Sequence, residues 1–164
     1  MAAGVDAHVH LWDPAHRRCP WWSEVHLPIQ RRFSLSDLRQ EMQGHGLEQA
    51  VVVEAFADAQ ETAELLRLAE GNRAVAGIVG WVDLTAPDIA DQLGRLSELP
   101  GGDALVGLRH PVHDEPDPEW LLRPDVLRGL AAAAIAGLAF DLLIRPRELR
   151  AAARLAAELP ALRL

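Results

Sequence analysis

Five short apolar runs recur along the chain, and a stretch with helical spacing follows each of them. The runs cover residues 5–11, 50–56, 75–82, 104–108 and 138–144, and nearly every position in them is apolar. Strands that are covered on both faces have this composition, and their alternation with helices indicates a parallel sheet built from β/α units. We therefore predict an α/β fold with five strands.

Helix start and stop signals lie between the runs and predict helices near residues 36–44, 58–70, 87–98, 124–136 and 146–158. Asp58 with Glu61, and Thr85 with Asp88, have the spacing of N-cap arrangements. Prolines suited to a first helical turn are Pro87, Pro124 and Pro146, and glycines suited to a helix end are Gly71 and Gly137. In the last two helices, apolar stripes are expected to pack on the sheet: Val126, Leu127 and Leu130, then Leu149, Ala153 and Ala156.

The spacing of the strands suits a β/α barrel or a doubly wound sheet, both of which use units of about 30 residues. His10 is followed by Leu-Trp-Asp-Pro, so the glycine-rich dinucleotide fingerprint is missing after the first strand and the barrel is favoured. After Pro160, Ala-Leu-Arg-Leu has the pattern of an opening sixth strand. We predict that residues 1–164 form a single domain, an incomplete barrel of the TIM type with about five of its eight units.

The composition excludes several functions. A net charge of -8 argues against nucleic acid as a partner. All 16 basic residues are arginine, which excludes Schiff-base chemistry, a P-loop lysine and a carbamylated-lysine metal bridge within these residues. A single cysteine, Cys19, excludes an intrachain disulfide, and neither a secretory signal nor a membrane span is recognisable. We expect a cytoplasmic protein.

His8 and His10 are the most informative pair of residues. Side chains two apart on a strand share a face, so both imidazoles are expected to project together at the end of the first strand. Imidazole suits zinc and similar divalent ions, although further ligands must come from elsewhere in the fold. The pair is therefore a candidate metal site. The alternative is two histidines satisfied by hydrogen bonds at a solvated strand end.

Polar residues recur at or near the ends of the later predicted strands, where sites form in parallel β/α folds. They are Glu54, Trp81, Asp83, Arg109, His110 and Asp141. We predict that these six residues bind the substrate, because a guanidinium and an imidazole at a strand end suit a carboxylate or a carbonyl oxygen. Alternatively, Glu54 and Asp83 cap a loop or helix, and Asp141 pairs with a neighbouring arginine.

The segment from residue 12 to residue 33 has little regular pattern and is longer than most loops, as is common for lids and binding loops. It contains His16, Cys19, Trp21, Trp22 and His26. The tryptophans suit either an aromatic or sugar-sized pocket or packing at the barrel rim.

Taken together, these motifs resemble the amidohydrolase superfamily, and within it the amidohydrolase-related branch that includes sugar lactonases and predicted metal-dependent TIM-barrel hydrolases. The resemblance rests on four segments: Val5-Asp6-Ala7-His8-Val9-His10-Leu11-Trp12-Asp13-Pro14, Gly80-Trp81-Val82-Asp83-Leu84, Gly107-Leu108-Arg109-His110 followed by Asp114-Glu115-Pro116-Asp117-Pro118, and Phe140-Asp141-Leu142-Leu143. It implies an eight-unit barrel that hydrolyses a small lactone or a related ester or amide.

The resemblance also implies roles for residues of this chain. His8 and His10 would be metal ligands or, in relatives that work without metal, would bind the substrate carbonyl, and Arg109 and His110 would contact the substrate. The cofactor is one divalent metal, zinc or manganese, or none. The later histidine strand and the last-strand aspartate of the family have no counterpart here, so the catalytic residues are unassigned.

The leading hypothesis is a lactonase-like hydrolase of a small-molecule substrate, represented by its N-terminal portion. One alternative is a ligand-binding half barrel that pairs with a second copy or with a missing C-terminal half, and another is a decarboxylase of a related barrel.

Overall fold

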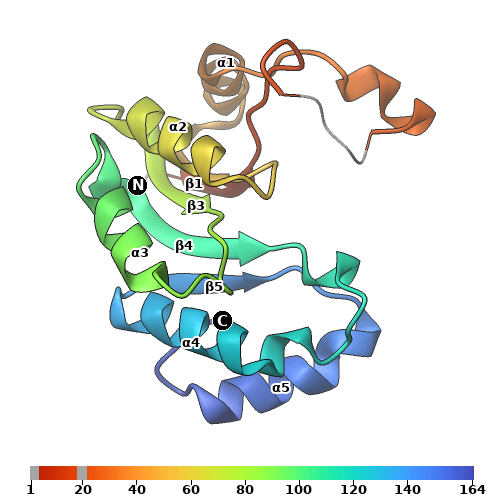
Figure 1. Cartoon of the computed structure of the whole chain (residues 1–164). Coiled ribbons are helices and arrows are strands. Elements are labelled where there is room, and N and C mark those ends of the chain that lie inside the picture. Colours follow the sequence, from red (N-terminus) through yellow and green to blue (C-terminus); the bar gives the residue numbers. More distant parts are fainter. Residues whose placement is uncertain (1–3, 18–21) are drawn as a thin grey trace.

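The computed structural model describes residues 4–17 and 22–164 of the chain. The predictions for Cys19 and Trp21 lie outside the described residues. The described parts form one curved sheet with helices around it (Figure 1). Among these residues, no helix is long and apolar enough to cross a lipid bilayer.

Five parallel strands make up the sheet, and they lie side by side in the order in which they occur in the chain. The strands are β1 (Gly4–Val9), β2 (Leu47–Val53), β3 (Val75–Gly80), β4 (Leu105–His110) and β5 (Ala139–Leu142). A helix follows each strand before the next begins, which is the arrangement of repeated β/α units. The prediction of an incomplete TIM-type barrel with five units is confirmed, since the sheet is an open half barrel.

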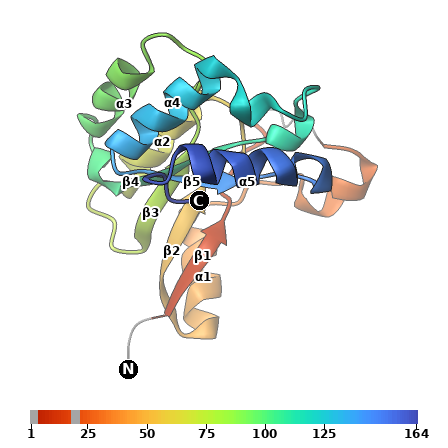
Figure 2. The same cartoon turned by 90° about the horizontal axis from the view of Figure 1, so that it is seen from below.

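The helices that connect the strands lie close to their predicted positions. They are α1 (Leu35–His45), α2 (Ala59–Ala69), α3 (Ile89–Ser97), α4 (Pro124–Ile135) and α5 (Leu149–Glu158). Pro124 opens α4, and Gly71 and Gly137 have positive φ angles, as expected for residues that end a helix. Figure 2 shows α1 beside β1 and β2, away from α3, α4 and α5.

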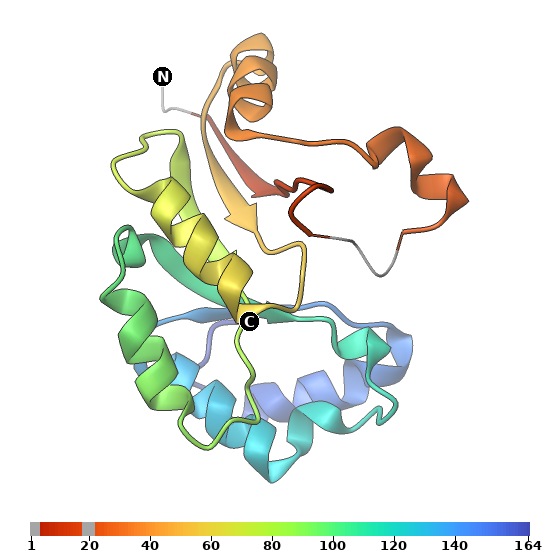
Figure 3. The same cartoon turned by 45° about the horizontal axis from the view of Figure 1, so that its top comes forward.

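Five short 3₁₀ helices complete the structure: η1 (Glu24–Ile29), η2 (Gly102–Ala104), η3 (Val112–Asp114), η4 (Trp120–Leu122) and η5 (Pro146–Glu148). The first of them, η1, lies on an arm that projects from the sheet in the long loop after β1 (Figure 3). The base of this arm is closed by an antiparallel bridge between Trp12 and Phe33.

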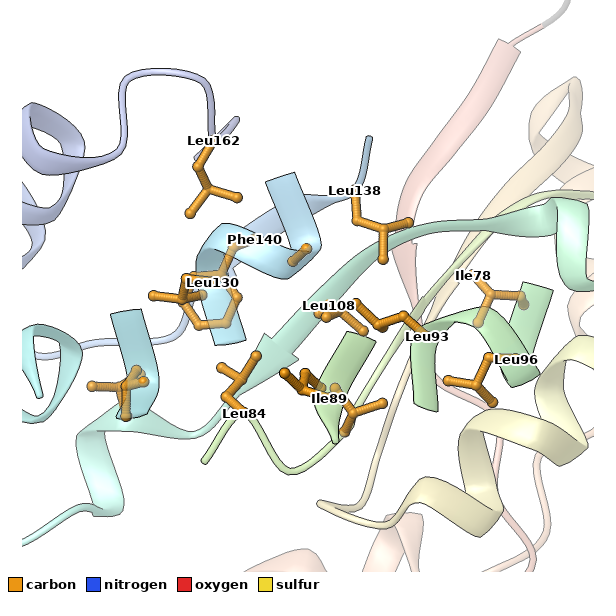
Figure 4. Packing of buried hydrophobic residues seen from close by; sticks show 14 of the residues in the cluster. Ile78, Leu84, Ile89, Leu93, Leu96, Leu108, Leu130, Leu138, Phe140 and Leu162 are labelled. Atoms are coloured by element: carbon orange, nitrogen blue, oxygen red, sulfur yellow. The ribbon is translucent and has the colours of Figure 1, made fainter. Parts of the chain in front are cut away.

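The hydrophobic core lies between the sheet and the helices that cover it (Figure 4). Ile78, Leu108 and Phe140 project from successive strands and are almost completely buried. Leu93 of α3 and Leu130 of α4 pack against this layer. Burial of side chains of this size supplies most of the free energy that holds the helices on the sheet.

Two details of the helix predictions are wrong. In α5, the predicted stripe of Leu149, Ala153 and Ala156 is exposed, and the buried residues are Ala151, Ala152 and Leu155. The signal fails because only arginine interrupts the small apolar residues of this helix, so several faces look equally apolar.

The second error concerns the start of α3. Asp88 occupies the N-cap position but makes no capping hydrogen bond through its side chain, and Thr85 instead donates to Asp83. In α2, Asp58 does cap the helix by accepting from the Gln60 N–H. Glu61 does not complete a capping box with Asp58 and instead accepts from the Phe56 N–H.

The predicted opening of a sixth strand is supported by backbone contacts at the end of the chain. Arg163 forms a parallel bridge with Ala139, and its carbonyl oxygen accepts a 2.8 Å hydrogen bond from the Phe140 N–H. Arg163 therefore lies beside β5, where the next strand of a barrel belongs.

Candidate functional site

His8 and His10 meet at the carboxyl end of β1, as the alternation of side chains predicts. Their Nε2 atoms are 3.1 Å apart, and His10 Nδ1 lies 2.9 Å from the carbonyl oxygen of Val53. Because a carbonyl oxygen only accepts, His10 Nδ1 donates, and in the neutral ring Nε2 is left as an acceptor. Burial lowers the pKa of His10, with the Arg109 charge acting in the same direction, which favours this neutral form.

Arg109 and Glu54 form a buried ion pair next to the histidines. Arg109 Nε donates to Glu54 Oε1 at 2.7 Å, and Arg109 Nη2 donates to the carbonyl oxygen of Glu54 at 2.5 Å. The two side chains are only 10% and 4% exposed, and burial raises the pKa of Glu54 while the guanidinium partly offsets this effect. The pair brings the ends of β2 and β4 together and fixes the plane of the guanidinium.

The third nitrogen of Arg109 faces the histidines. Arg109 Nη1 is 3.4 Å from His8 Nε2. Since His10 Nε2 is an acceptor, the 3.1 Å contact makes His8 Nε2 the donor, so this atom cannot also accept from Arg109. An Arg109 N–H therefore points at the histidine pair with no lone pair opposite it. This donor is suited to an oxygen atom of a ligand.

Trp81 and His110 form a second cluster at the ends of β3 and β4. Trp81 Nε1 donates to His110 Nδ1 at 3.0 Å, which leaves His110 Nε2 as the donor to Glu115 Oε1 at 2.8 Å. The imidazole stacks on Trp120 with 4.2 Å between ring centroids. Burial lowers the pKa of His110, although Glu115 acts in the opposite direction, and the ring is held as one neutral tautomer.

The structure places Asp83 and Asp141 differently from these two clusters. Asp83 is exposed, and its carboxylate accepts from the backbone and hydroxyl of Thr85, which is the loop-capping arrangement. Asp141 pairs in register with Arg109 on the neighbouring strand, so the two side chains share a face of the sheet.

Of the predicted site residues, His8, His10, Glu54 and Arg109 are in direct contact, and Trp81 and His110 form a second pair. Their role in substrate binding stays a prediction. Sequence reasoning did not single out Glu115 and Trp120, which hold His110 in place. Glu115 lies five residues after His110, and this short distance in an acidic turn was the available signal.

In the long loop after β1, Arg17 forms ion pairs with residues of α2 and its N-cap. Its guanidinium donates to Asp58 at 2.7 Å and to both carboxylate oxygens of Glu64 at 2.7 and 3.2 Å. A cavity of about 440 Å³ lies between this loop, α1 and α2, and neither His8 nor His10 lines it. The loop therefore shapes a space separate from the histidine pair.

The two histidines fit a metal ion only in part. A cation about 2.0–2.1 Å from each Nε2 would fit between nitrogens 3.1 Å apart. Among residues 4–17 and 22–164, however, no group of three or more His, Cys, Asp and Glu side chains is arranged to hold a metal. Arg109 also places a positive charge beside His8. The described residues do not form a complete metal site.

Curated relatives match all or most of the chain. It is 32% identical over 164 residues to an L-fucono-1,5-lactonase of Burkholderia ambifaria, with 100% of this chain and 56% of the relative covered. A second L-fucono-1,5-lactonase, from Burkholderia multivorans, is 31% identical over 149 residues, or 90% of this chain and 49% of that protein. The chain therefore spans about half the length of these relatives.

Solved structures and a family model agree with this relationship. An amidohydrolase from Burkholderia multivorans, crystallised with bound HEPES, superposes with a TM-score of 0.89 at 29% identity and covers 98% of this chain and 55% of its own. A crystal form with bound zinc gives a TM-score of 0.87 at 31% identity, with the same two shares covered. The amidohydrolase family model matches residues 5–164, and the chain thus belongs to the amidohydrolase family.

Proposed function

We propose that this chain provides the carbonyl-binding part of a site that hydrolyses a small sugar lactone, as the N-terminal part of an eight-unit barrel. The observation that carries the proposal is the Arg109 N–H that faces the His8–His10 pair with no acceptor opposite it. The names of the two Burkholderia relatives support a sugar lactone as the substrate, and L-fucono-1,5-lactone is the first compound to test.

The chemistry of lactone opening suits these groups. Water adds to the carbonyl carbon, negative charge develops on the carbonyl oxygen, and the bond from that carbon to the ring oxygen then breaks. The ring oxygen takes up a proton and becomes a hydroxyl, and the product is an open-chain hydroxy acid. Arg109 Nη1 would donate a hydrogen bond to the oxygen on which the charge develops.

Fixed donors are needed for this role, because a donor that must reorient during the reaction stabilises the charge less. Glu54 holds two of the three guanidinium nitrogens of Arg109, and the Val53 carbonyl holds the ring of His10. Trp81 and His110 would form a neighbouring wall of the substrate pocket. The base that takes a proton from water is not assigned to a described residue.

The proposal also includes a divalent metal bound at the His8–His10 pair. If bound, it would polarise the carbonyl and lower the pKa of its water toward about 7. His8 and His10 would supply two of its ligands, and the rest would come from other parts of the protein. No step above depends on it, and the assay therefore includes metal-free conditions.

The test is release of acid from L-fucono-1,5-lactone and other aldonolactones by this chain and by the longest natural protein that contains it. Each protein is assayed with chelator, with zinc and with manganese. Substitution of Arg109→Met should lower kcat/KM by about 100-fold or more. His45→Ala, which removes an exposed histidine at the end of α1, should change it less than twofold.

Absence of ring opening in the longer protein under all three conditions would refute the hydrolase proposal. Retained binding of an aldonate would then favour the ligand-binding alternative, and release of carbon dioxide from a carboxylated substrate would favour the decarboxylase.

A further inference from the structure

The first turn of α2 carries two adjacent polar side chains that are almost completely buried. Glu61 is 4% exposed and Thr62 is 0% exposed. Neither side chain reaches the His8–His10 pair, and among residues 4–17 and 22–164 no arginine is hydrogen-bonded to Glu61. Burial of a carboxylate costs stability unless hydrogen bonds or a charged partner compensate for its lost hydration.

Glu61 binds the backbone of the loop that follows β2. Its Oε2 accepts from the N–H groups of Ala55 at 3.1 Å and Phe56 at 2.9 Å, and its Oε1 lies 3.3 Å from the Ala55 nitrogen. These are the two residues directly after Glu54. The carboxylate thereby fixes the peptide whose other side, the Glu54 carbonyl, accepts from Arg109.

Thr62 binds the residue that follows β3 in a similar way. Its hydroxyl accepts from the Trp81 N–H at 2.8 Å and donates to the Trp81 carbonyl at 2.7 Å. The Thr62 methyl group lies so close to Gly80 that no side chain fits at that position. The same tryptophan donates its indole N–H to His110.

We propose that Glu61 and Thr62, here called the α2 brace, are positioning residues that hold the two halves of the site independently. Glu61 positions Arg109 through Glu54, and Thr62 positions His110 through Trp81. This inference rests on the proposed function in one respect: it treats the four positioned residues, Glu54, Arg109, Trp81 and His110, as a site. The contacts themselves connect one helical turn to two neighbouring strand ends.

Within the described residues, Glu54 and Arg17 are the charged groups that act most on Glu61. Glu54 lies near it and disfavours its ionised form, whereas Arg17 favours that form. Arg17 is itself held by Asp58 and Glu64. The hydrogen bonds from two backbone N–H groups need only an acceptor, so a glutamine oxygen should replace the carboxylate while leucine should not.

Solvent exchange of two side-chain protons, followed by NMR on the 164-residue chain, tests the α2 brace. The Nε–H of Arg109 reports its bond to Glu54, and the indole N–H of Trp81 reports its bond to His110. Glu61→Leu should speed exchange of the Arg109 proton by about tenfold and leave the Trp81 proton within twofold. Thr62→Val should produce the reverse pattern.

The conservative variants Glu61→Gln and Thr62→Ser keep an acceptor and a hydroxyl, and both protons should stay within twofold of the parent. Glu70→Gln, which removes an exposed carboxylate at the end of α2, is the matched control.

Equal acceleration of both protons in either variant would show general loosening of the fold and overturn the proposal, as would no change in either. The measurement requires only that Glu61→Leu and Thr62→Val fold well enough to give the two NMR signals. If one of them does not fold, Glu61→Ala or Thr62→Ala takes its place. No lactone is used, so failure of the hydrolase proposal and failure of the α2 brace give different results.

Discussion

At the level of single residues, Arg109 explains why arginine rather than lysine suits this site. Its Nε and Nη2 atoms bind the side chain and the carbonyl of Glu54, and its Nη1 atom still faces His8. An ammonium group has no planar fork and could not hold these directions at once. The buried ion pair therefore orients a donor, although burial of both charges limits its net contribution to stability.

The ionisation of Glu61 should make the stability of the fold depend on pH. Burial raises its pKa from 4.5 to about 7, so the folded chain binds the proton more tightly than the unfolded chain does. The free energy of unfolding contributed by this group should fall as the pH rises from about 4.5 to about 7, by about 3 kcal/mol in total. Urea unfolding at pH 5, 6, 7 and 8 measures it.

The comparison with Glu61→Gln isolates this group. The pKa values of His10 and His110 are lowered, so these residues make the fold more stable as the pH rises and act against Glu61. Both histidines are present in the parent and the variant, and their effects cancel in the difference. A parent-minus-variant difference that is constant from pH 5 to pH 8 would show that Glu61 does not titrate in this range.

At the level of elements, α4 depends on a glycine in its interior. Gly129 is buried, and a Cβ atom there would overlap the carbonyl of Leu84 in the loop after β3. Gly129→Ala should therefore lower the free energy of unfolding by about 1–3 kcal/mol, although alanine is the better helix former. Urea unfolding at a single pH gives the value.

Gly94 in α3 provides the matched control, because nothing lies within 4 Å of a Cβ atom at that exposed position. Gly94→Ala should raise the free energy of unfolding by up to about 1 kcal/mol. If both alanine variants were more stable than the parent, the close approach of α4 to Leu84 would be wrong.

The strands and helices could be predicted from the sequence because each has a signal within a few residues. The contacts of the site could not, because they join residues that are distant in the sequence. The apolar runs and the cap at Asp58 are readable within a few residues, whereas α5, rich in alanine, gave the wrong face. His8 and His10 follow from their spacing on one strand. The binding of Glu61 to the Ala55 and Phe56 backbone depends on how α2 packs, and a capping box was the nearest local interpretation.

At the level of the whole molecule, the open sheet exposes one complete strand edge. Within the part of the chain that the structure describes, β1 pairs with β2 alone, whereas β5 is also contacted by Arg163. His8 at the end of β1 is exposed. This exposure is expected, because β1 is an edge strand and the described residues place no strand on its other side. The same open side leaves backbone groups of β1 available to another chain.

This edge should make the 164-residue chain associate with itself. Val5 of β1 is 47% exposed, and an apolar side chain on an unpaired edge favours strand pairing between copies. We expect sedimentation velocity between about 5 and 200 µM to show an average mass that rises with concentration, and Val5→Lys to reduce the rise. Val25→Lys on η1, at a position 81% exposed but outside the sheet, should leave it unchanged. A parent chain that stays monomeric throughout, or an equal response to both lysines, would show that the β1 edge does not drive association.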